Sequence, residues 1–218
     1  MIGNVQIKIC GLTSVADAES ATEIGADYLG FIFHSASPRN VSPEQYAAMS
    51  RRLPVRRRVA VVVEPTIETL KALAAAGFDR FQVHFQPGGD VGRLARWSDA
   101  VGRDRLWLAP KLPLGTAFPE ELLPQGRSFL LDGYKPGLDG GTALNSDWTL
   151  FGRLRTGHPE KEWILSGGLA AANIAQALGE TGATVIDANS GVESAPGVKD
   201  SRKLQALADA IRAFQAPR

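Results

Sequence analysis

The chain has 218 residues, of which 44% are hydrophobic and 22% charged, the composition of an ordinary soluble protein with a packed core. Its 24 basic and 23 acidic residues leave a formal net charge of +1, which argues against a general nucleic-acid or membrane-surface binder. The lone Cys10 excludes an internal disulfide and a cysteine-rich zinc site, and it suits a reducing cytoplasm.

The N-terminal residues lack the charged segment and long apolar run of a signal peptide. No stretch approaches the roughly 18 apolar residues that a membrane span requires. We therefore expect a cytoplasmic protein that contacts neither membrane nor nucleic acid.

Eight short runs rich in Val, Ile, Leu and Phe have the pattern of buried strands. In chain order they are Val5–Cys10, Tyr28–Phe33, Arg58–Val63, Arg80–His84, Leu106–Lys111, Ser128–Asp132, Trp163–Ser166 and Thr184–Asp187. Each interval between successive strand ends is long enough for one right-handed βαβ crossover.

Helical spacing and capping residues fill most of these intervals. The predicted helices are Val15–Ile24, a helix opening at Ser42-Pro43-Glu44, Thr66–Ala76, Asp90–Val101, Ser146–Arg155, Ala171–Leu178 and Ser201–Phe214. The interval Pro113–Gln125 contains three prolines, so we expect at most a short helix there.

Eight such units predict an α/β protein with a closed (β/α)8 TIM barrel, formed by residues 1–218 as a single domain. A doubly wound open sheet is the structural alternative. It is less favoured because no glycine-rich dinucleotide fingerprint follows the first strand.

In such a barrel the active site lies at the C-terminal ends of the strands. Lys8 and Cys10 share one face of the first strand. Because a lysine in an apolar strand is costly unless it points into a polar barrel mouth, Cys10 is expected to point inward as well. A free thiol is a poor base at neutral pH unless a cation such as Lys8 favours the thiolate. A buried structural thiol is the alternative.

Asp132 ends the apolar run of the sixth strand. A carboxyl group in this position tends to have a raised pKa and can donate a proton near neutral pH, although it could instead cap the next loop. That loop, Gly133–Asn145, carries four glycines and is either a lid or merely a flexible connection.

Two glycine-rich turns follow the seventh and eighth strands, Ser166-Gly167-Gly168 and Asn189-Ser190-Gly191. Barrels of this class hold phosphate on backbone N–H groups at these positions, so we predict a phosphate site there. Ordinary turn glycines are the alternative.

Other charged and titratable residues have simpler interpretations. The arginines at 51, 52, 56, 57 and 58 fall at a helix end and the following turn, on the non-catalytic face of the barrel. The three histidines His34, His84 and His158 are too scattered in the sequence to indicate a metal site. We therefore predict no metal site from them.

Motifs spread over nearly the whole chain resemble those of the phosphoribosylanthranilate isomerases, in the same order. They are Lys8-Ile9-Cys10-Gly11-Leu12-Thr13, Gly30-Phe31-Ile32-Phe33, Ser37-Pro38-Arg39-Asn40-Val41-Ser42, Gln82-Val83-His84, Leu131-Asp132, Gly140-Gly141-Thr142, Asp147-Trp148, Leu165-Ser166-Gly167-Gly168-Leu169, Ala172-Asn173, Asp187, Ser190-Gly191-Val192-Glu193, Pro196-Gly197 and Lys199-Asp200. The resemblance implies a barrel enzyme of tryptophan biosynthesis that opens and rearranges a phosphorylated aminosugar.

At the matching positions, the resemblance implies Cys10 as general base and Asp132 as general acid of an Amadori rearrangement. It implies that Arg39 binds the anthranilate carboxylate and that His84 and Asp187 line the sugar site. The implied phosphate cradle consists of Gly167, Gly168, Asn189, Ser190 and Gly191. The implied reaction requires no metal or cofactor. The implied partner is a small-molecule phosphosugar; the oligomeric state is left open, with a monomer as the first expectation.

Phe85, Ala143, Ala188-Asn189 and Glu64-Pro65 depart from the family pattern, and none of them removes the acid or the base. Among related barrels, a ribulose-phosphate epimerase would need metal-binding His and Asp residues at its strand ends. A histidine-pathway sugar isomerase typically has paired Asp residues, where Cys10 stands here. A catalytically silent phosphosugar-binding protein is the alternative from another class.

Overall fold

Eight parallel strands close into a barrel in the computed structural model, which describes residues 1–90, 92–133 and 147–216. The strands are β1 (Gln6–Ile9), β2 (Tyr28–Ile32), β3 (Arg57–Val63), β4 (Arg80–Phe85), β5 (Leu106–Pro110), β6 (Ser128–Leu131), β7 (Glu162–Leu165) and β8 (Val185–Ala188). Each strand pairs with the next, and β8 pairs with β1. The predicted (β/α)8 TIM barrel is therefore confirmed, and the open-sheet alternative is wrong.

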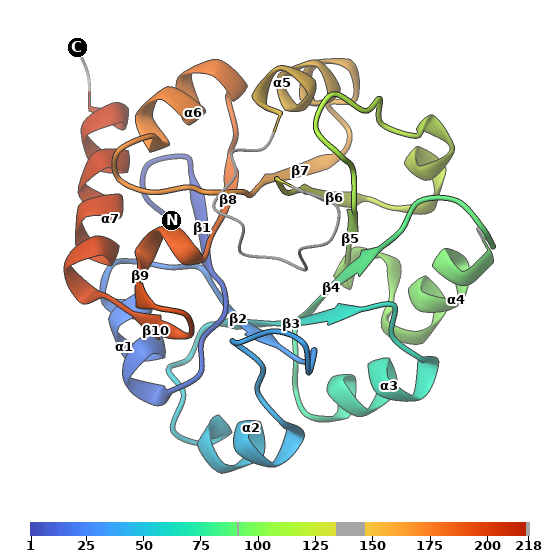
Figure 1. The fold of residues 1–218 in the computed structure, drawn as a ribbon, viewed down its shortest axis with the longest axis horizontal. Helices are drawn as coiled ribbons and strands as arrows, with labels where there is room; N and C mark the ends of the chain where they lie inside the picture. Colours follow the sequence, from blue (N-terminus) through green and yellow to red (C-terminus); the bar gives the residue numbers. More distant parts are fainter. Residues whose placement is uncertain (91, 134–146, 217–218) are drawn as a thin grey trace.

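Helices surround the barrel on its outside (Figure 1). They are α1 (Val15–Glu23), α2 (Pro43–Ser50), α3 (Ile67–Ala75), α4 (Gly92–Val101), α5 (Trp148–Gly157), α6 (Ile174–Thr181) and α7 (Ser201–Gln215), with short 3-10 segments η1 (Arg103–Arg105), η2 (Glu120–Gln125) and η3 (Ser190–Val192). Only η2 stands between β5 and β6 in the described chain, which agrees with the effect expected of the prolines there.

Side-chain caps fix where several helices begin. Ser14 accepts a hydrogen bond from the Asp17 N–H at the start of α1. Ser42 and Gln45 form a capping box at the start of α2, where Pro43 is the first helical residue. These hydrogen bonds satisfy N–H groups that the first turn of a helix leaves unpaired.

Strand alternation divides the apolar side chains into two layers. Ile7 and Ile9 of β1 lie in the core between the barrel and the helices. Cys10 lies in the smaller core inside the barrel, together with Tyr28 and Trp107, whose rings make an edge-to-face contact at 5.0 Å. Lys8 and Cys10 therefore share the inner face, as predicted from the period of a strand.

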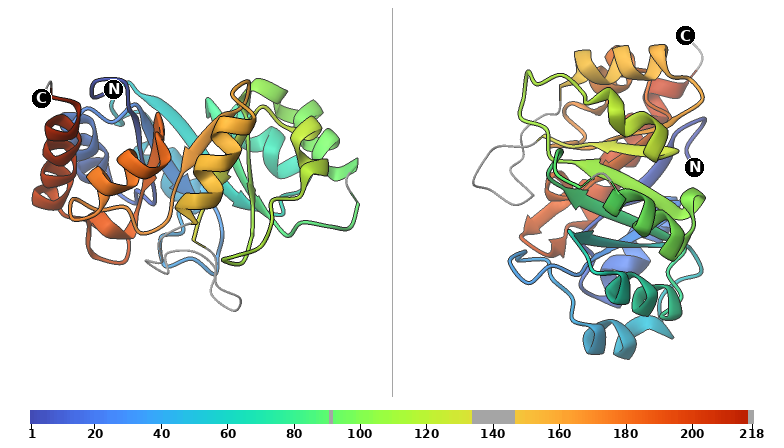
Figure 2. Two further views of the ribbon diagram at one scale, coloured as in Figure 1. Left: turned by 90° about the horizontal axis from the view of Figure 1, so that it is seen from above. Right: turned by 90° about the vertical axis from the view of Figure 1, so that its right-hand side faces the viewer.

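A two-stranded antiparallel hairpin, β9 (Glu193–Ala195) and β10 (Val198–Lys199), follows η3 and was not predicted from the sequence. This hairpin and the loop between β2 and α2 lie toward the face of the barrel opposite the N-terminus (Figure 2). Both segments therefore lie at the end where the strands terminate, which is the face on which an active site is expected.

The strand ends differ slightly from those predicted. Cys10 and Asp132 each lie one residue beyond β1 and β6, whereas Asp187 lies within β8. Of the predicted loop Gly133–Asn145, only Gly133 lies within the described residues. No helix in the described part of the chain is both long and apolar enough to cross a membrane.

Candidate active site

A buried ion pair lies inside the barrel between β1 and β8. Lys8 and Asp187 are register partners on these strands, and the Lys8 Nζ donates to Asp187 Oδ2 at 2.7 Å. Gly30 on β2 leaves room for the lysine, because a Cβ there would lie 2.9 Å from Lys8 Cε. Asp187 Oδ1 is buried and has no hydrogen-bond partner among the described residues, so this oxygen can accept a hydrogen bond from a ligand.

The Cys10 thiol lies on the same inner face, and its proton is held more tightly than expected. Burial and the Asp187 carboxylate raise the pKa of Cys10, against the smaller opposing effects of Lys8 and Lys199. Lys8 does favour the thiolate, through its charge and a hydrogen bond to the thiol, but burial and the Asp187 carboxylate outweigh this effect.

Asp132 follows β6 and has the environment predicted for a general acid. Burial and the charge of Asp187 raise the pKa of Asp132 to about 6, although the Gly133 N–H, Lys8 and the Ser166 hydroxyl favour the ionised form. Asp187 therefore acts electrostatically on both Cys10 and Asp132. The two predicted catalytic residues therefore share one neighbouring carboxylate that influences the pKa of each.

Two turns lie beside each other after β7 and β8. Gly167 and Gly168 have φ values of +96° and +60°, a region that side chains rarely adopt. Gly191 packs so closely on the first turn that a Cβ there would lie 2.1 Å from the Leu169 carbonyl oxygen. The two predicted phosphate-binding turns are therefore in contact. The first needs glycine for its positive φ angles, and the second needs glycine for this close approach.

The second of these turns begins at Asn189, which is the residue before η3. The Asn189 side chain does not point freely at a ligand, because its Oδ1 accepts a hydrogen bond from Lys199 Nζ at 2.9 Å. The backbone of Ser190 and Gly191 opens the 3-10 turn, where N–H groups are suited to hold an anion.

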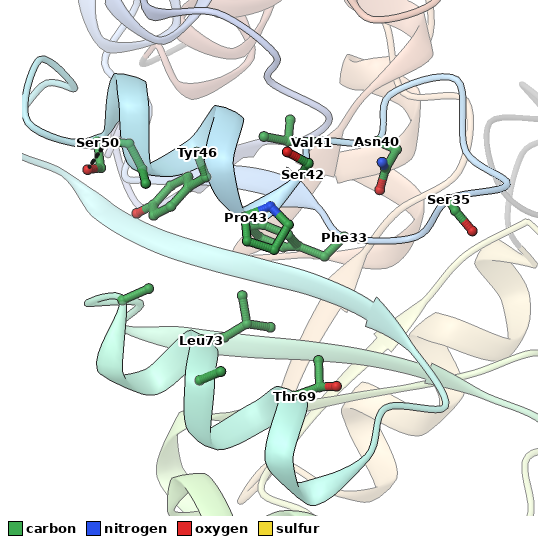
Figure 3. A pocket seen from close by; sticks show the side chains of 13 residues that line it. Phe33, Ser35, Asn40, Val41, Ser42, Pro43, Tyr46, Ser50, Thr69 and Leu73 are labelled. Atoms are coloured by element: carbon green, nitrogen blue, oxygen red, sulfur yellow. Dashed lines mark hydrogen bonds between the residues drawn. The ribbon is translucent and has the colours of Figure 1, made fainter.

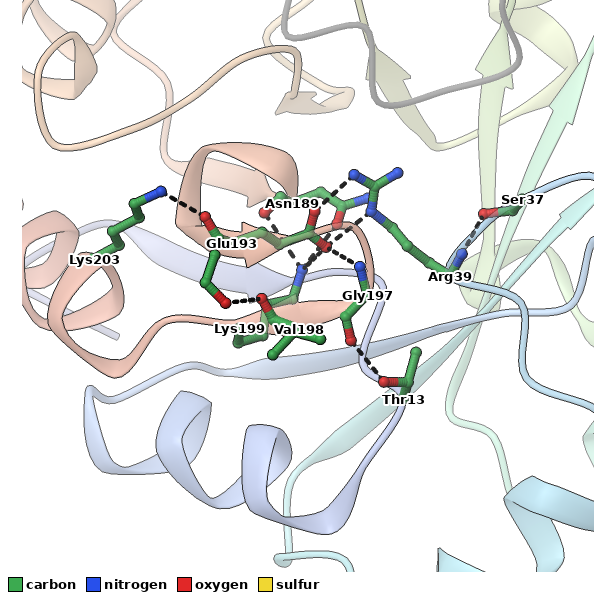
Figure 4. Close-up of polar contacts among 10 residues, drawn as sticks. Thr13, Ser37, Arg39, Asn189, Glu193, Gly197, Val198, Lys199 and Lys203 are labelled. Carbon is green, nitrogen blue, oxygen red and sulfur yellow. Dashed lines mark hydrogen bonds and ion pairs between the residues drawn. The ribbon is translucent and has the colours of Figure 1, made fainter.

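Arg39 lies in the loop between β2 and α2 and is buried, with 6% of its surface exposed. Its Nε and Nη2 donate to the two carboxylate oxygens of Glu193 at 2.8 and 2.6 Å (Figure 4). A Cβ on Gly11 would lie 2.7 Å from both Arg39 Cδ and Asn189 Oδ1, so the arginine lies close to the phosphate-binding turn. The Nη1 end of Arg39 has no hydrogen bond to the described protein.

Two residues of this arrangement, Glu193 and Lys199, belong to motifs shared with the family but were not predicted as site residues. The Lys199 Nζ donates to Glu193 Oε1 at 2.8 Å and to the carbonyl oxygen of Asn189 at 3.3 Å (Figure 4). The useful signal in the sequence was Pro196-Gly197 between two charged residues, since this pair is typical of a turn.

His84 is the penultimate residue of β4, which continues to Phe85, one residue beyond the predicted strand end. Its Nε2 lies 2.7 Å from the amide nitrogen of Gln82, which occupies the preceding inward position on the same strand. His84 therefore lines the same end of the barrel as Cys10 and Asp132. Within the described ranges, no three His, Cys, Asp or Glu side chains form a group that could hold a metal ion.

A separate groove of about 570 Å³ lies between α2 and α3 on the outside of the barrel (Figure 3). Phe33, Tyr46 and Leu73 line it, and none of the predicted catalytic or phosphate-binding residues does. The arginines that precede and begin β3 serve the opposite end of the barrel: Arg57 donates to the Tyr28 hydroxyl at 2.8 Å and Arg56 to the Ala26 carbonyl. These contacts agree with a structural role.

Comparisons with known proteins agree with this geometry. A family model described as N-(5'phosphoribosyl)anthranilate (PRA) isomerase matches residues 7–210. The N-(5'-phosphoribosyl)anthranilate isomerase of Zymomonas mobilis is 35% identical over 219 residues, which cover 96% of this chain and 99% of that protein.

Two solved structures extend the similarity to the fold. The crystal structure of phosphoribosyl anthranilate isomerase from Thermus thermophilus has a TM-score of 0.79 and 30% identity, covering 96% of this chain and 99% of that one. A second structure is that of the isomerase in complex with reduced 1-(o-carboxyphenylamino)-1-deoxyribulose 5-phosphate. It has a TM-score of 0.74 and 26% identity, and covers 96% of this chain and 99% of its own.

Proposed function

Because this chain belongs to the N-(5'-phosphoribosyl)anthranilate isomerase family, we propose that it performs the Amadori rearrangement with Asp132 as general acid and Cys10 as general base. The enzyme is an isomerase of tryptophan biosynthesis. Its substrate is N-(5'-phosphoribosyl)anthranilate, and its product is 1-(2-carboxyphenylamino)-1-deoxyribulose 5-phosphate. The observation that carries this mechanism is the raised pKa of Asp132 at the mouth of the barrel.

In the first step Asp132 protonates the ring oxygen of the ribose, and the ring opens to a protonated imine. A carboxyl group with a pKa of about 6 is a much better donor near neutral pH than an ordinary aspartic acid. Asp187 contributes to this property, because its negative charge disfavours a second carboxylate nearby.

In the second step Cys10 takes the proton from the adjacent carbon, giving an enolamine that tautomerises to the ketose. The raised pKa of Cys10 means that the thiol is the resting form, so the productive state with ionised Cys10 and protonated Asp132 is a minor one. The positive charge of the protonated imine favours the thiolate at the moment when the base is needed. The imine is also its own electron sink, so the chemistry calls for no metal or cofactor.

The remaining residues bind the two anionic ends of the substrate. We assign the phosphate to the backbone N–H groups of Gly167, Gly168, Ser190 and Gly191, with Asn189 fixing the second turn. We assign the anthranilate carboxylate to Arg39, and the sugar hydroxyls to His84 and the unpaired oxygen of Asp187. A relative with reduced product bound supports this class of ligand.

The test is a fluorescence assay that follows the loss of phosphoribosylanthranilate with the purified full chain, which we propose acts as one catalytic domain. Turnover that persists after thorough chelation is the expected result. Binding of the reduced product without turnover would identify a catalytically silent protein and would refute the proposed mechanism. Light scattering on the same sample tests the expectation of a monomer.

A further inference from the structure

The β9–β10 hairpin holds a buried cluster of charges beside the proposed substrate site. Glu193 is 6% exposed and receives a two-pronged contact from Arg39, a single hydrogen bond from Lys199, and the Gly197 N–H at 3.2 Å. Although burial opposes ionisation, the hydrogen bonds from Arg39 and Lys199 keep the pKa of Glu193 below its usual value. The carboxylate is therefore a fixed negative charge.

The cluster carries more positive than negative charge. Arg39 and Lys199 are both buried, and Glu193 is the only carboxylate of the described residues that pairs with either of them. Buried charges are costly unless they are paired, so the site has one cation in excess. The excess lies next to Asn189 and the phosphate-binding turn, where an anionic group of a ligand would balance it.

The geometry of the contact explains how the Glu193 carboxylate holds the Arg39 guanidinium in one orientation. A guanidinium has a planar fork of donors, and the Nε–Nη2 edge of Arg39 is occupied by Glu193. The fork cannot rotate without breaking both bonds, so its Nη1 edge keeps one direction. Lys199 fixes Glu193 in turn and also fixes both the carbonyl and the side chain of Asn189.

We infer that Glu193 and Lys199 are positioning residues for substrate binding: Glu193 aims Arg39 at the carboxylate of the substrate, and Lys199 ties this grip to the phosphate-binding turn through Asn189. The inference rests on the proposed function, since it takes Arg39 as the carboxylate contact. It assigns the hairpin a role in affinity, not in proton transfer.

The test compares two ligands, the reduced product and its analogue without the aromatic carboxylate, by calorimetric titration. The dissociation constant of the analogue divided by that of the reduced product measures how much the carboxylate contributes to binding. We expect a ratio of about tenfold to a hundredfold in the wild type. Glu193→Gln makes the site more positive, so a purely electrostatic role would leave the ratio unchanged or increase it. The positioning role predicts that the ratio falls at least about fivefold.

Two further variants separate position from charge. Glu193→Asp keeps the charge but shortens the reach, and it should also lower the ratio, so it carries the test if Glu193→Gln does not fold. The double variant Glu193→Gln/Lys199→Met restores the net charge of the wild-type cluster without its geometry, and its ratio should stay as low as that of Glu193→Gln. A double variant with the wild-type ratio would overturn the inference.

Lys203→Met is the matched control, because Lys203 donates to the backbone carbonyl of Glu193 at 2.5 Å without contacting Arg39 or Asn189. Its ratio should stay within about twofold of the wild type, and kcat should change little in all these variants while KM rises in the Glu193 variants. A wild type that binds neither ligand would refute the proposed function itself. A wild type with the expected ratio, beside a Glu193→Gln variant that keeps it, would refute the positioning role alone.

Discussion

Lys8 and Asp187 face each other across the junction of the first and last strands, with Lys8 Nζ 2.7 Å from Asp187 Oδ2 and 0% and 4% of the two side chains exposed. The pair lies one inward position below Cys10, and its carboxylate influences both proposed catalytic groups. The ion pair that joins β1 to β8 therefore also influences the pKa values of Cys10 and Asp132.

Lys8→Met should destabilise the protein by about 3 kcal/mol at neutral pH, because it leaves the Asp187 carboxylate buried without its partner. The loss should be smaller at low pH. Burial raises the pKa of Asp187 and Lys8 opposes this rise, so the folded-state pKa is higher in the variant than in the wild type. As the pH falls through that pKa, Asp187 of the folded variant takes up a proton and the variant regains stability relative to the wild type. Urea unfolding at about pH 8 and pH 5 measures this; an equal loss at both pH values would contradict it. The double variant Lys8→Met/Asp187→Asn should recover part of the stability.

Asp187→Asn should move both limbs of the pH profile of kcat/KM to lower pH. The Asp187 charge raises the pKa values of Asp132 and Cys10, so its removal makes both groups easier to ionise. In the wild type we expect the profile to bend near pH 6 on the acid side, where Asp132 titrates. Asp209→Asn, which removes an exposed carboxylate on α7, is the control and should leave the limbs in place.

The strand period was sufficient to predict that Lys8 and Cys10 point inward, because side chains alternate along a strand whatever its neighbours are. It could not predict that the pKa of Cys10 is raised in spite of Lys8. This net shift comes from burial and from Asp187, which is 179 residues away from Lys8 in the chain and meets it only when the barrel closes. Glu193 and Lys199 were missed for a similar reason: Arg39 comes from the distant loop between β2 and α2, and the hairpin is too short to give a periodic signal.

Arg39→Ala should weaken binding of the substrate by about 1.5–3 kcal/mol, the range for hydrogen bonds to charged groups, with a smaller effect on kcat. Glu193 keeps Lys199 as a partner, so the hairpin should remain folded. Arg39→Lys keeps the charge but not the fork, and it should restore only part of the affinity. Steady-state kinetics separate KM from kcat in both variants. An unchanged KM in Arg39→Ala would show that the carboxylate binds elsewhere.

Gly191→Ala should weaken inhibition by inorganic phosphate at least about tenfold, because a Cβ there would lie 2.1 Å from the Leu169 carbonyl oxygen and would push the two turns apart. Gly179→Ala is the matched control on α6, where a Cβ would have its nearest contact at 3.7 Å, with Phe214. The control should keep the inhibition constant of the wild type. If Gly191→Ala kept it as well, the phosphate would not be held between these turns.

Cys10→Ser and Asp132→Asn should each lower kcat by about 10²–10⁴-fold, the usual contribution of a general acid or base. The serine hydroxyl keeps the approximate shape of the thiol but rarely ionises, and the asparagine amide cannot donate an acidic proton. Neither residue holds the phosphate or the carboxylate in the proposed mechanism, so titration with the reduced product should give nearly the wild-type affinity. Near-normal kcat in either variant would show that the substituted residue does not have its assigned role. Variants that lose affinity and rate in the same proportion would show that Cys10 and Asp132 shape the pocket without transferring the protons, because a group acting only in proton transfer stabilises the transition state and leaves the bound product unaffected.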